Sequence, residues 1–307
     1  MTTQPELSAP PIARAALDRA AAERTDDGLL DAARTDPATR VLVIRGDAAP
    51  MATAKGAAAP ALRLVSPDAV RGDAEWAFLG REEDGAAVLL AAVPSGAEDP
   101  VDAPEGWAGL RAVGGTLDAA ELAVFVEALS LGRWLLDAPF CPACGTRTQT
   151  KHAGWSRHCP ACGREHFPRT DPAVIVAVES EDGERLLLGS NALWEQERYS
   201  CFAGFVEAGE SLETTVVREV QEESGIRVSG ITYRGSQAWP YPRSLMVGFR
   251  ARATADRDAR ADGEEIVQVR WFTRDEIALA LDGGSDVKMP GPASIAHRLI
   301  RDWCEGR

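Results

Sequence analysis

The chain has 307 residues, of which 45% are hydrophobic, and a formal net charge of −14 at pH 7. This length suffices for two domains of ordinary size with apolar cores. The acidic balance argues against a protein that grips nucleic acid through general electrostatics. No run of about eighteen apolar residues occurs, and no secretory signal is visible, so we expect a cytoplasmic protein without a membrane span.

The first 138 residues are predicted to form an N-terminal α+β domain. Apolar runs typical of strands occupy residues 41–46, 62–66, 75–80 and 86–93. Residues 46–60 are low in complexity and predict a mobile loop. Residues 117–138 repeat apolar side chains with the period of a helix. No residue pattern in this part of the chain predicts a chemistry by itself.

Residues 139–168 contain two Cys-x-x-Cys pairs, fourteen residues apart: Cys141, Cys144, Cys159 and Cys162. Two residues between cysteines let both thiolates face one ion, and two such turns complete a tetrahedral site. The pattern predicts one structural Zn²⁺ per chain, because four thiolates leave no position open for chemistry. Disulfide bonds are the alternative, and a cytoplasmic location argues against them. The nearby histidines are expected to have surface or packing roles: His152, His158 and His166.

Residues 169–307 are predicted to form the second large domain. Runs typical of strands lie at 173–180, 185–190, 227–235, 244–254 and 265–273. A glutamate-rich helix lies between the second and third of these runs, and two closing helices are expected at 275–281 and 293–305. The order β-β-α-β-β-β-α indicates a mixed α+β arrangement in which a sheet packs against helices.

Three glutamates of the glutamate-rich helix share one helical face, because Glu219, Glu222 and Glu223 are three and four residues apart. Like charges at this spacing repel, so we expect a cation among them. Carboxylate oxygens are preferred ligands of Mg²⁺ and Mn²⁺, and the cluster predicts such a site. The alternative is a solvated acidic face. Ser211 is the expected N-cap, and Gly225 can end the helix in a left-handed conformation.

The stretch 204–226 fits the signature of the Nudix hydrolases, G-x5-E-x7-R-E-U-x-E-E-x-G-U, in which U is a bulky apolar residue. The matching residues are Gly204, Glu210, Arg218, Glu219, Val220, Glu222, Glu223, Gly225 and Ile226. This resemblance implies a Nudix α/β/α sandwich with a mixed sheet, and a Mg²⁺- or Mn²⁺-dependent hydrolase that cleaves a nucleoside diphosphate linked to another group. It implies that the glutamate cluster binds the metals and activates water, while Glu210 and Arg218 hold the loop against the helix.

The segment Ser-Gln-Ala-Trp-Pro-Tyr-Pro-Arg-Ser, residues 236–244, follows this signature. Its prolines stiffen the backbone, Trp239 and Tyr241 offer surfaces to flat rings, and Gln237 and Ser244 can hydrogen-bond a ribose or a phosphate. The alternative is an edge strand that ends in a proline-rich turn.

This segment resembles the S-Q-P-W-P-F-P-x-S element of the NADH pyrophosphatase branch of the Nudix family, with Ala238 in place of a proline and Tyr241 in place of a phenylalanine. The resemblance implies that the whole element contacts substrate: Gln237, Ala238, Trp239, Pro240, Tyr241, Pro242, Arg243 and Ser244. That branch also carries a four-cysteine ribbon directly before its Nudix domain, in the order found here. Some of its members remove NAD caps from RNA.

The resemblance assigns further residues one by one. Phe167 and Phe205 are expected to be stacking rings, with Phe205 against the nicotinamide. The Ala203 backbone lies where the family has a metal-binding carbonyl, and Ala296 lies where it has a backbone contact to substrate.

Glu265 aligns best with an additional metal-binding glutamate, and Glu264 is the competing choice. Arg111 aligns with an arginine that faces the phosphates. Gly154 stands where some members have a substrate-contacting glutamate, which puts one polar contact in doubt.

The sequence therefore predicts an enzyme that hydrolyses the pyrophosphate of NADH or NAD⁺ to AMP and the nicotinamide mononucleotide, with NAD-capped RNA as a further candidate substrate. The alternatives are a pyrophosphatase for ADP-ribose or dinucleoside polyphosphates, and a zinc-ribbon regulator that senses a nucleotide without catalysis. The intact Arg-Glu-Val-Gln-Glu-Glu sequence argues against the regulator, since a sensor does not need every carboxylate. The branch is usually homodimeric, so the resemblance implies a homodimer.

Overall fold

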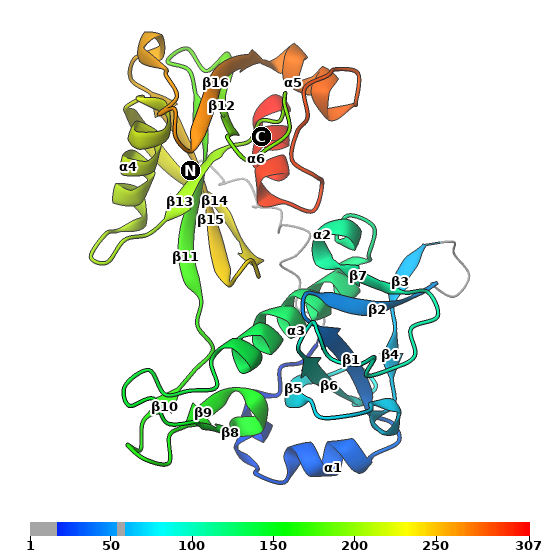
Figure 1. The fold of residues 1–307 in the computed structure, drawn as a ribbon. Helices are drawn as coiled ribbons and strands as arrows, with labels where there is room; N and C mark the ends of the chain where they lie inside the picture. The colour runs from blue at the N-terminus through cyan, green and yellow to red at the C-terminus, as the bar shows by residue number, and fades with distance from the viewer. Residues whose placement is uncertain (1–16, 54–58) are drawn as a thin grey trace, which may run out of the picture. The chain divides into compact units, whose positions relative to one another are not determined.

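The computed structural model describes residues 17–53 and 59–307, which form two compact units (Figure 1). The C-terminal unit consists of Thr170–Trp239 and Ser244–Arg307. The N-terminal unit holds the described residues up to Arg169, together with the turn Pro240–Arg243. The predicted N-terminal domain and ribbon thus lie in one unit, and the three-part division at 1–138, 139–168 and 169–307 stays a proposal.

The C-terminal unit is built on a six-stranded sheet in the order β14-β15-β11-β12-β16, with β13 paired to β11. The sheet is mixed, because β11 and β15 run parallel while the other pairs are antiparallel. Its strands are β11 (Asp171–Glu179), β12 (Arg185–Asn191), β13 (Phe202–Phe205), β14 (Val228–Trp239), β15 (Ser244–Ala253) and β16 (Ile266–Thr273). Its helices are α4 (Leu212–Ser224), α5 (Arg274–Leu281) and α6 (Ile295–Cys304), with a 3-10 turn η5 (Asp256–Asp258). The sequence analysis missed only the four-residue strand β13 among these strands.

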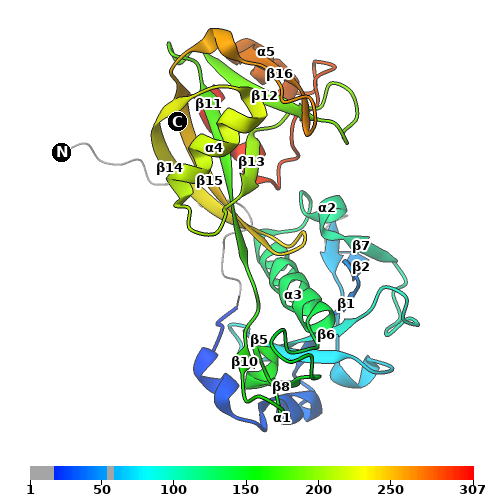
Figure 2. The ribbon, with the colours of Figure 1, turned by 60° about the vertical axis from the view of Figure 1, so that its left-hand side comes forward.

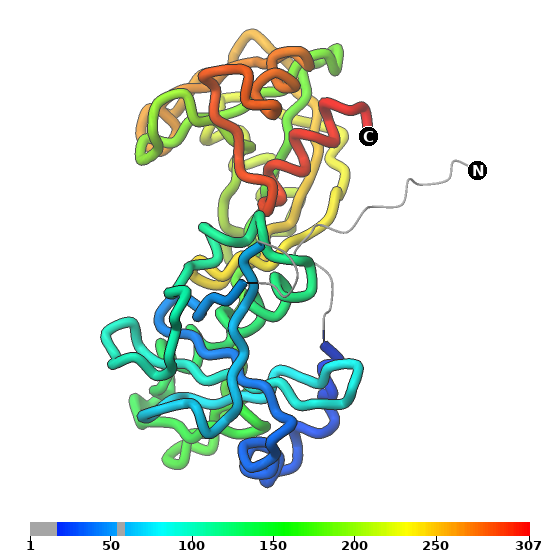
Figure 3. The backbone as a smooth tube through the Cα atoms, turned by 90° about the vertical axis from the view of Figure 1, so that its right-hand side faces the viewer, coloured from blue at the N-terminus to red at the C-terminus, as the bar shows by residue number. Residues whose placement is uncertain are grey.

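Alternation along β11 gives this sheet two apolar faces. Val174 and Val176 pack in one core with Val220 of α4. Ile175 packs in the other core with Ile300 of α6. Helix α4 therefore covers one face (Figure 2), and α6, red at the end of the backbone trace, covers the other (Figure 3). This layering confirms the predicted fold class.

The N-terminal unit contains a seven-stranded sheet in the order β3-β2-β1-β6-β5, with β4 paired to β1 and β7 to β2. Its strands are β1 (Arg40–Arg45), β2 (Ala48–Thr53), β3 (Pro60–Leu62), β4 (Leu64–Val65), β5 (Glu75–Arg81), β6 (Ala87–Val93) and β7 (Trp107–Gly109). Its helical elements are η2 (Ala21–Thr25), α1 (Leu29–Thr35), η3 (Pro67–Ala69), α2 (Leu110–Val113) and α3 (Ala119–Asp137). The ribbon adds β8 (Gln149–Lys151), η4 (His152–Gly154), β9 (Ser156–His158) and β10 (Glu165–His166). Across the described residues, no helix has both the length and the apolarity that a bilayer crossing requires.

The predicted mobile loop at 46–60 is wrong for residues 48–53 and for Pro60. Strand β2 covers Ala48–Thr53 and pairs with β3, which begins at Pro60. Residues 54–58 lie outside the described residues. Alanine-rich composition hid this strand, because Ala49 is buried by partners distant in sequence rather than marked by a local apolar pattern.

The two units repeat one set of strand connections. In the C-terminal unit β11 pairs in parallel with β15 and antiparallel with β12 and β13, and in the N-terminal unit β1 pairs in parallel with β6 and antiparallel with β2 and β4. The outer pairs also correspond, β14 to β5 and β16 to β7. Two differences stand out: the three-residue turn η3 (Pro67–Ala69) stands where the other unit has helix α4, and β3 has no counterpart in the six-stranded sheet. The sequence analysis did not detect this repeat.

Candidate active site

Helix α4 begins and ends where its sequence predicts. The Ser211 hydroxyl accepts a hydrogen bond from the Thr214 N–H at 3.2 Å, which confirms the expected N-cap. Gly225 follows the helix with φ of 69°, the left-handed conformation that glycine adopts without strain. Val216 and Val220 are fully buried and hold the helix against the sheet. The acidic residues between these points therefore take defined places.

Arg218 places a positive charge among the glutamates. Its Nη1 donates to Glu219 Oε1 at 2.9 Å and to Glu222 Oε2 at 3.1 Å. Its Nε and Nη2 donate to the two carboxylate oxygens of Glu210 at 2.7 and 2.9 Å. Nη2 also donates to the Phe205 carbonyl at 3.0 Å. All five N–H donors of one guanidinium can thus be used, and this charge offsets the repulsion within the cluster.

Glu210 is held as an ionised carboxylate. Besides Arg218, it accepts hydrogen bonds from the Thr215 hydroxyl at 2.8 Å and from the Glu207 N–H at 3.1 Å. The Arg218 hydrogen bonds, supported by the Glu207 N–H, lower the pKa of Glu210 to about 2. A group with this pKa exchanges no proton near neutral pH. Its contacts tie the loop before α4 to the helix.

Glu223 has the opposite environment. Its side chain is buried, and its Oε2 accepts a hydrogen bond from the Ala203 N–H at 3.3 Å. Burial, with the negative charges of Glu265 and Glu219 nearby, raises the pKa of Glu223 to about 8. Burial also raises the pKa of Glu219, against the lowering effect of Arg218. Three carboxylates therefore gather at a place that a divalent cation would neutralise.

Gly204 allows strand β13 to pass directly over this cluster. A Cβ at position 204 would lie 1.9 Å from both the carboxyl carbon and Oε1 of Glu219, far inside any tolerated contact. The expected close approach of the backbone at Gly204 is confirmed. Any side chain at 204 would force the Glu219 carboxylate to move.

The choice between Glu265 and Glu264 as a metal ligand stays a proposal. Glu265 contributes through its charge to the raised pKa of both Glu219 and Glu223. Its Oε1 accepts a hydrogen bond from Asn191 Nδ2 at 3.3 Å. The sequence analysis did not select Asn191, which carries no motif and is marked only by its place at the end of a strand.

The donor set fits a hard divalent cation, since carboxylates and the Ala203 carbonyl offer only oxygen ligands. The carboxylates are not drawn tightly together, however. Within residues 17–53 and 59–307, the four ribbon cysteines are the one group of three or more Cys, His, Asp or Glu side chains whose ligand atoms all lie within 4.8 Å of one another. At the helix, Arg218 occupies part of the space that the carboxylates share.

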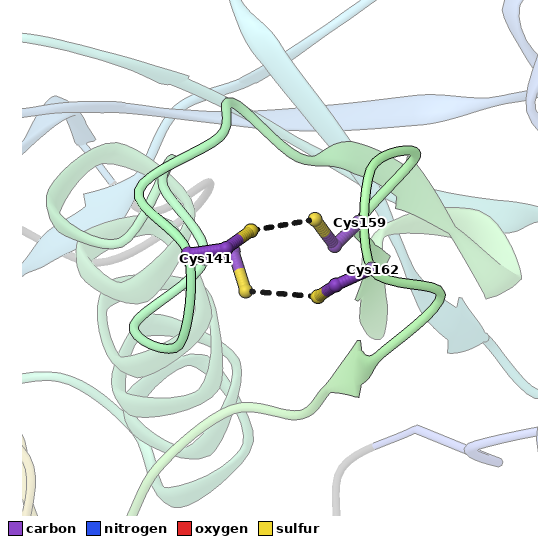
Figure 4. Close-up of side chains that lie close together, drawn as sticks. Cys141, Cys159 and Cys162 are labelled. Carbon is purple, nitrogen blue, oxygen red and sulfur yellow. Dashed lines mark hydrogen bonds between the residues drawn. The ribbon is translucent and has the colours of Figure 1, made fainter.

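The four cysteines form a site of the size that zinc requires. The Sγ atoms of Cys141 and Cys162 are 3.7 Å apart (Figure 4). Those of Cys144 and Cys159 are 3.5 Å apart. Tetrahedral Zn–S bonds of about 2.3 Å place sulfurs about 3.8 Å apart, so a zinc ion fits between them. His166 Nε2 lies 3.3 Å from the Cys141 Sγ and orients a ligand rather than adding one.

The predicted substrate residues of the C-terminal unit have different exposures. The Phe205 side chain is 52% exposed and free to meet a ring. Gln237 is buried instead: its Nε2 donates to the Ala293 carbonyl at 2.7 Å, and its Oε1 accepts from the Ile295 N–H at 2.6 Å. The Gln237 amide therefore bonds residues directly before Ala296, where α6 begins, and is not presented to solvent.

The element 236–244 forms an edge strand that ends in a proline-containing turn, and its contacts with substrate stay a proposal. Residues up to Trp239 extend the edge strand β14, with Trp239 half-buried and paired with buried Ser244. The rest form the turn, which belongs to the N-terminal unit. In this turn the Pro240 carbonyl accepts a hydrogen bond from Arg133 Nη1 at 2.6 Å.

The N-terminal unit also contains Arg111, whose guanidinium lies 4.2 Å from the centre of the Tyr241 ring. Phe167 is 62% exposed. Arg133 lies 5.5 Å from the same Tyr241 ring and was not selected from the sequence, because an arginine on an amphipathic helix carries no motif. The proposed phosphate contact of Arg111 and the proposed substrate contacts of Ala238, Pro242 and Arg243 stay proposals.

Gly154 cannot be replaced by a larger residue in this chain. It has φ of 95°, and a Cβ there would lie 2.3 Å from the Cβ of Ala77 in β5. A packing role therefore explains this glycine, and the polar contact that some relatives are expected to make from this position is absent here.

The comparisons with known proteins bear on the whole chain. Three family models match it: the NUDIX domain at residues 169–289, the NADH pyrophosphatase zinc ribbon domain at 137–167, and the NADH pyrophosphatase-like rudimentary NUDIX domain at 38–134. The NAD-capped RNA hydrolases NudC of Mycobacterium bovis and Mycobacterium tuberculosis are 39% identical to it over 97% of this chain and 96% of their own. The chain belongs to the NADH pyrophosphatase branch of the Nudix hydrolases.

Two further similarities are partial. The human NAD-capped RNA hydrolase NUDT12 is 38% identical over 61% of this Nudix chain and 42% of its own. A NUDIX hydrolase of known structure from Nitrosomonas europaea is 25% identical and covers 55% of this chain and 91% of its own, with a TM-score of 0.44. The rudimentary NUDIX description of residues 38–134 agrees with the repeated strand connections of the N-terminal unit.

Replacing a ribbon ligand should release the metal. We expect about one zinc per chain in freshly reduced, unchelated protein, and Cys159→Ser should lower both the zinc content and the melting temperature. Cys304→Ser, a half-buried cysteine outside the ribbon, is the matched control and should keep its zinc. Metal analysis that finds no zinc in the wild type would contradict the assignment.

Adding a methyl group at position 204 should displace Glu219. Gly204→Ala is expected to weaken Mn²⁺ binding by about 10- to 100-fold, the usual effect of disturbing the support of a metal ligand. Gly291→Ala is the control, because nothing lies within 4 Å of a Cβ there. Calorimetric titration of both variants checks this, and equal Mn²⁺ affinity in the two would show that the contact is harmless.

Glu223 should make the metal-free protein less stable as pH rises. Its folded pKa of about 8 exceeds the ordinary value of 4.5, so between these pH values the folded state binds a proton that the unfolded state has lost. The free energy of unfolding should therefore fall through this window, by up to ~1.4 kcal/mol per pH unit. Glu223→Gln should remove that contribution. Urea unfolding in chelator from pH 5 to pH 8 tests it, and parallel pH profiles for the two proteins would rule it out.

Proposed function

We propose that this protein hydrolyses the pyrophosphate bond of NADH or NAD⁺ and releases AMP and the nicotinamide mononucleotide. The observation that carries the proposal is the match over 97% of the chain to NAD-capped RNA hydrolases. Such a match includes the ribbon and the element 236–244, the parts that distinguish this branch from other Nudix hydrolases. The bonds of Arg218 to Glu210 and Glu219 support it, because they arrange the signature residues around one point.

Mg²⁺ or Mn²⁺ is the proposed catalytic cofactor, with Glu219, Glu223, Glu265 and the Ala203 carbonyl as its ligands. When bound, such an ion neutralises charge on the diphosphate and lowers the pKa of a coordinated water. Arg218 fixes the direction of Glu219 through its Nη1 hydrogen bond. Burial keeps bulk water from Glu223.

One glutamate of the cluster is proposed to accept the proton of the attacking water. Glu222 suits this role, because its side chain is 59% exposed and its single bond to Arg218, at 3.1 Å, holds it at the edge of the cluster. Glu223 is the competing candidate. Glu210 is unsuited, because its low pKa and its bonds to Arg218 make it part of the scaffold.

Recognition of the substrate is assigned to rings rather than to the helix. Every candidate substrate contains the diphosphate that the helix is proposed to bind. Selection among these substrates must therefore come from protein surfaces that contact the groups at the two ends of the diphosphate. Phe205, Phe167, Trp239 and Tyr241 are the proposed ring surfaces, with Phe205 against the nicotinamide.

NAD-capped RNA is a second proposed substrate. The relatives that match 97% of this chain are named NAD-capped RNA hydrolases, and a capped RNA carries the same nicotinamide and diphosphate at its 5′ end. The net charge of −14 disfavours extended contacts with RNA phosphates, so we expect recognition of the cap more than of the RNA body.

The less favoured functions are hydrolysis of ADP-ribose or dinucleoside polyphosphates, and nucleotide sensing without catalysis. A cytoplasmic homodimer completes the proposal, on the grounds of the branch resemblance. Light scattering of the purified protein tests the dimer. A monomer at micromolar concentration would refute the dimer and leave the proposed reaction unaffected.

The decisive experiment incubates the zinc-loaded protein with NADH and Mg²⁺ and separates the products. We expect AMP and reduced nicotinamide mononucleotide, with no turnover in excess chelator of Mg²⁺. Glu222→Gln and Glu223→Gln keep side-chain volume but remove a charge from the site, and should each lower kcat by about 10²- to 10³-fold. Glu213→Gln, an exposed glutamate in the first turn of the same helix, is the matched control.

Two results would overturn the proposal. If the wild-type protein cleaves ADP-ribose faster than NADH, the enzyme has another preferred substrate. Near-normal turnover in both glutamine variants would remove the chemistry from α4.

A further inference from the structure

Two large apolar side chains stand in solvent on the loop between β12 and β13. Leu193 is 92% exposed and Trp194 is 41% exposed. Exposing a leucine and an indole side by side leaves their surface in water without the gain from burial. Neither side chain has a role in the proposed function.

The loop is fixed in this conformation by hydrogen bonds at its start. The Asn191 side-chain oxygen accepts from the Leu193 N–H at 2.9 Å, and the Asn191 carbonyl accepts from the Trp194 N–H at 3.0 Å. The Ala192 N–H donates to the Glu265 carbonyl at 2.9 Å. Backbone and side-chain bonds therefore hold the Leu193–Trp194 pair in a tight turn.

The end of the loop is also anchored. The Tyr199 N–H donates to the Lys288 carbonyl at 3.1 Å, and the Lys288 N–H donates to the Glu197 carbonyl at 2.7 Å. Lys288 Nζ pairs in addition with Glu195. A loop bound at both ends presents its apolar tip as a preformed surface.

The turn is attached to the candidate metal site itself. Asn191 bonds Glu265 Oε1 and Ala192 bonds the Glu265 carbonyl, so the same residue that faces Glu219 and Glu223 also carries the loop. The pairing of β12 with β16 shifts its register between Ser190 and Asn191. Irregularities of this kind often redirect a strand next to an active site.

Two exposed aromatic residues therefore each follow closely in sequence a residue that contacts the carboxylate cluster. Phe205 follows Gly204, which packs against Glu219, whereas Trp194 follows the turn bonded to Glu265. A dinucleotide whose diphosphate lies at the cluster has one flat group beyond each phosphate. Phe205 is proposed for the nicotinamide, and none of the other proposed rings is matched to the second flat group, a purine.

We propose that Trp194, flanked by Leu193, is the stacking surface for the purine base of the AMP half of the substrate. This inference rests on the proposed function and adds a subsite to it. Every purine offers a flat face that stacks on an indole, and such stacking does not depend on hydrogen-bond readout. Trp194 should therefore bind AMP and leave the nicotinamide mononucleotide unaffected.

The test measures binding of the two products separately, by calorimetry on the zinc-loaded protein with Mg²⁺ present. Trp194→Ala should weaken AMP binding by about 5- to 150-fold, the usual effect of losing one stacked ring. It should leave the affinity for nicotinamide mononucleotide within about twofold, and Trp194→Phe should restore most of the AMP affinity. Tyr233→Ala removes a ring that is 51% exposed on β14 and is the matched control.

AMP binding that is unchanged in Trp194→Ala, undetectable in the wild type, or weakened equally in Tyr233→Ala would overturn the subsite. If Trp194→Ala weakens the binding of both products equally, Trp194 has a general structural role. A loss confined to NAD-capped RNA, with AMP and NADH unaffected, would assign the ring to the nucleotide after the cap and also refute the proposal. Because product binding needs no turnover, failure of NADH hydrolysis in the wild type would instead refute the proposed function.

Discussion

The bonding of Arg218 is the constraint on which the active site depends. Without a cation, the carboxylates of Glu219, Glu222 and Glu223 would repel one another along α4. One guanidinium bonds two of them, and it also bonds Glu210 on the preceding loop and the carbonyl at the end of β13. Helix, loop and strand are therefore joined through a single charged group, and lysine, with a point charge and no planar fork, could not make the same set of bonds.

This arrangement pushes the pKa values of two carboxylates in opposite directions. Glu210 receives the Arg218 fork and two further donors, and its pKa falls to about 2. Glu223 is buried beside other carboxylates, and its pKa rises to about 8. The first carboxylate serves the scaffold whatever ligand is present. The second becomes favourable as an anion only when a cation arrives, which couples metal binding to proton release at neutral pH.

The sequence predicted those features that depend on local spacing. The cap at Ser211, the end at Gly225 and the four clustered cysteines each follow from residues within a few positions of one another. Features made by distant partners were missed or misread. Strand β2 was predicted as part of a loop, and the bonds of the Gln237 amide to the segment before α6 were not predicted.

The strand connections that the two units share were also not predicted from the sequence. They bear on which unit carries the catalytic residues. Strand pairing leaves no sequence signature, and η3 in place of α4 removes the one motif that would have identified the N-terminal copy. Among the described residues, this copy has no helix in the place of α4 to carry a carboxylate cluster. It holds instead the turn Pro240–Arg243, through the bond from Arg133 to the Pro240 carbonyl and the packing of Arg111 on the Tyr241 ring.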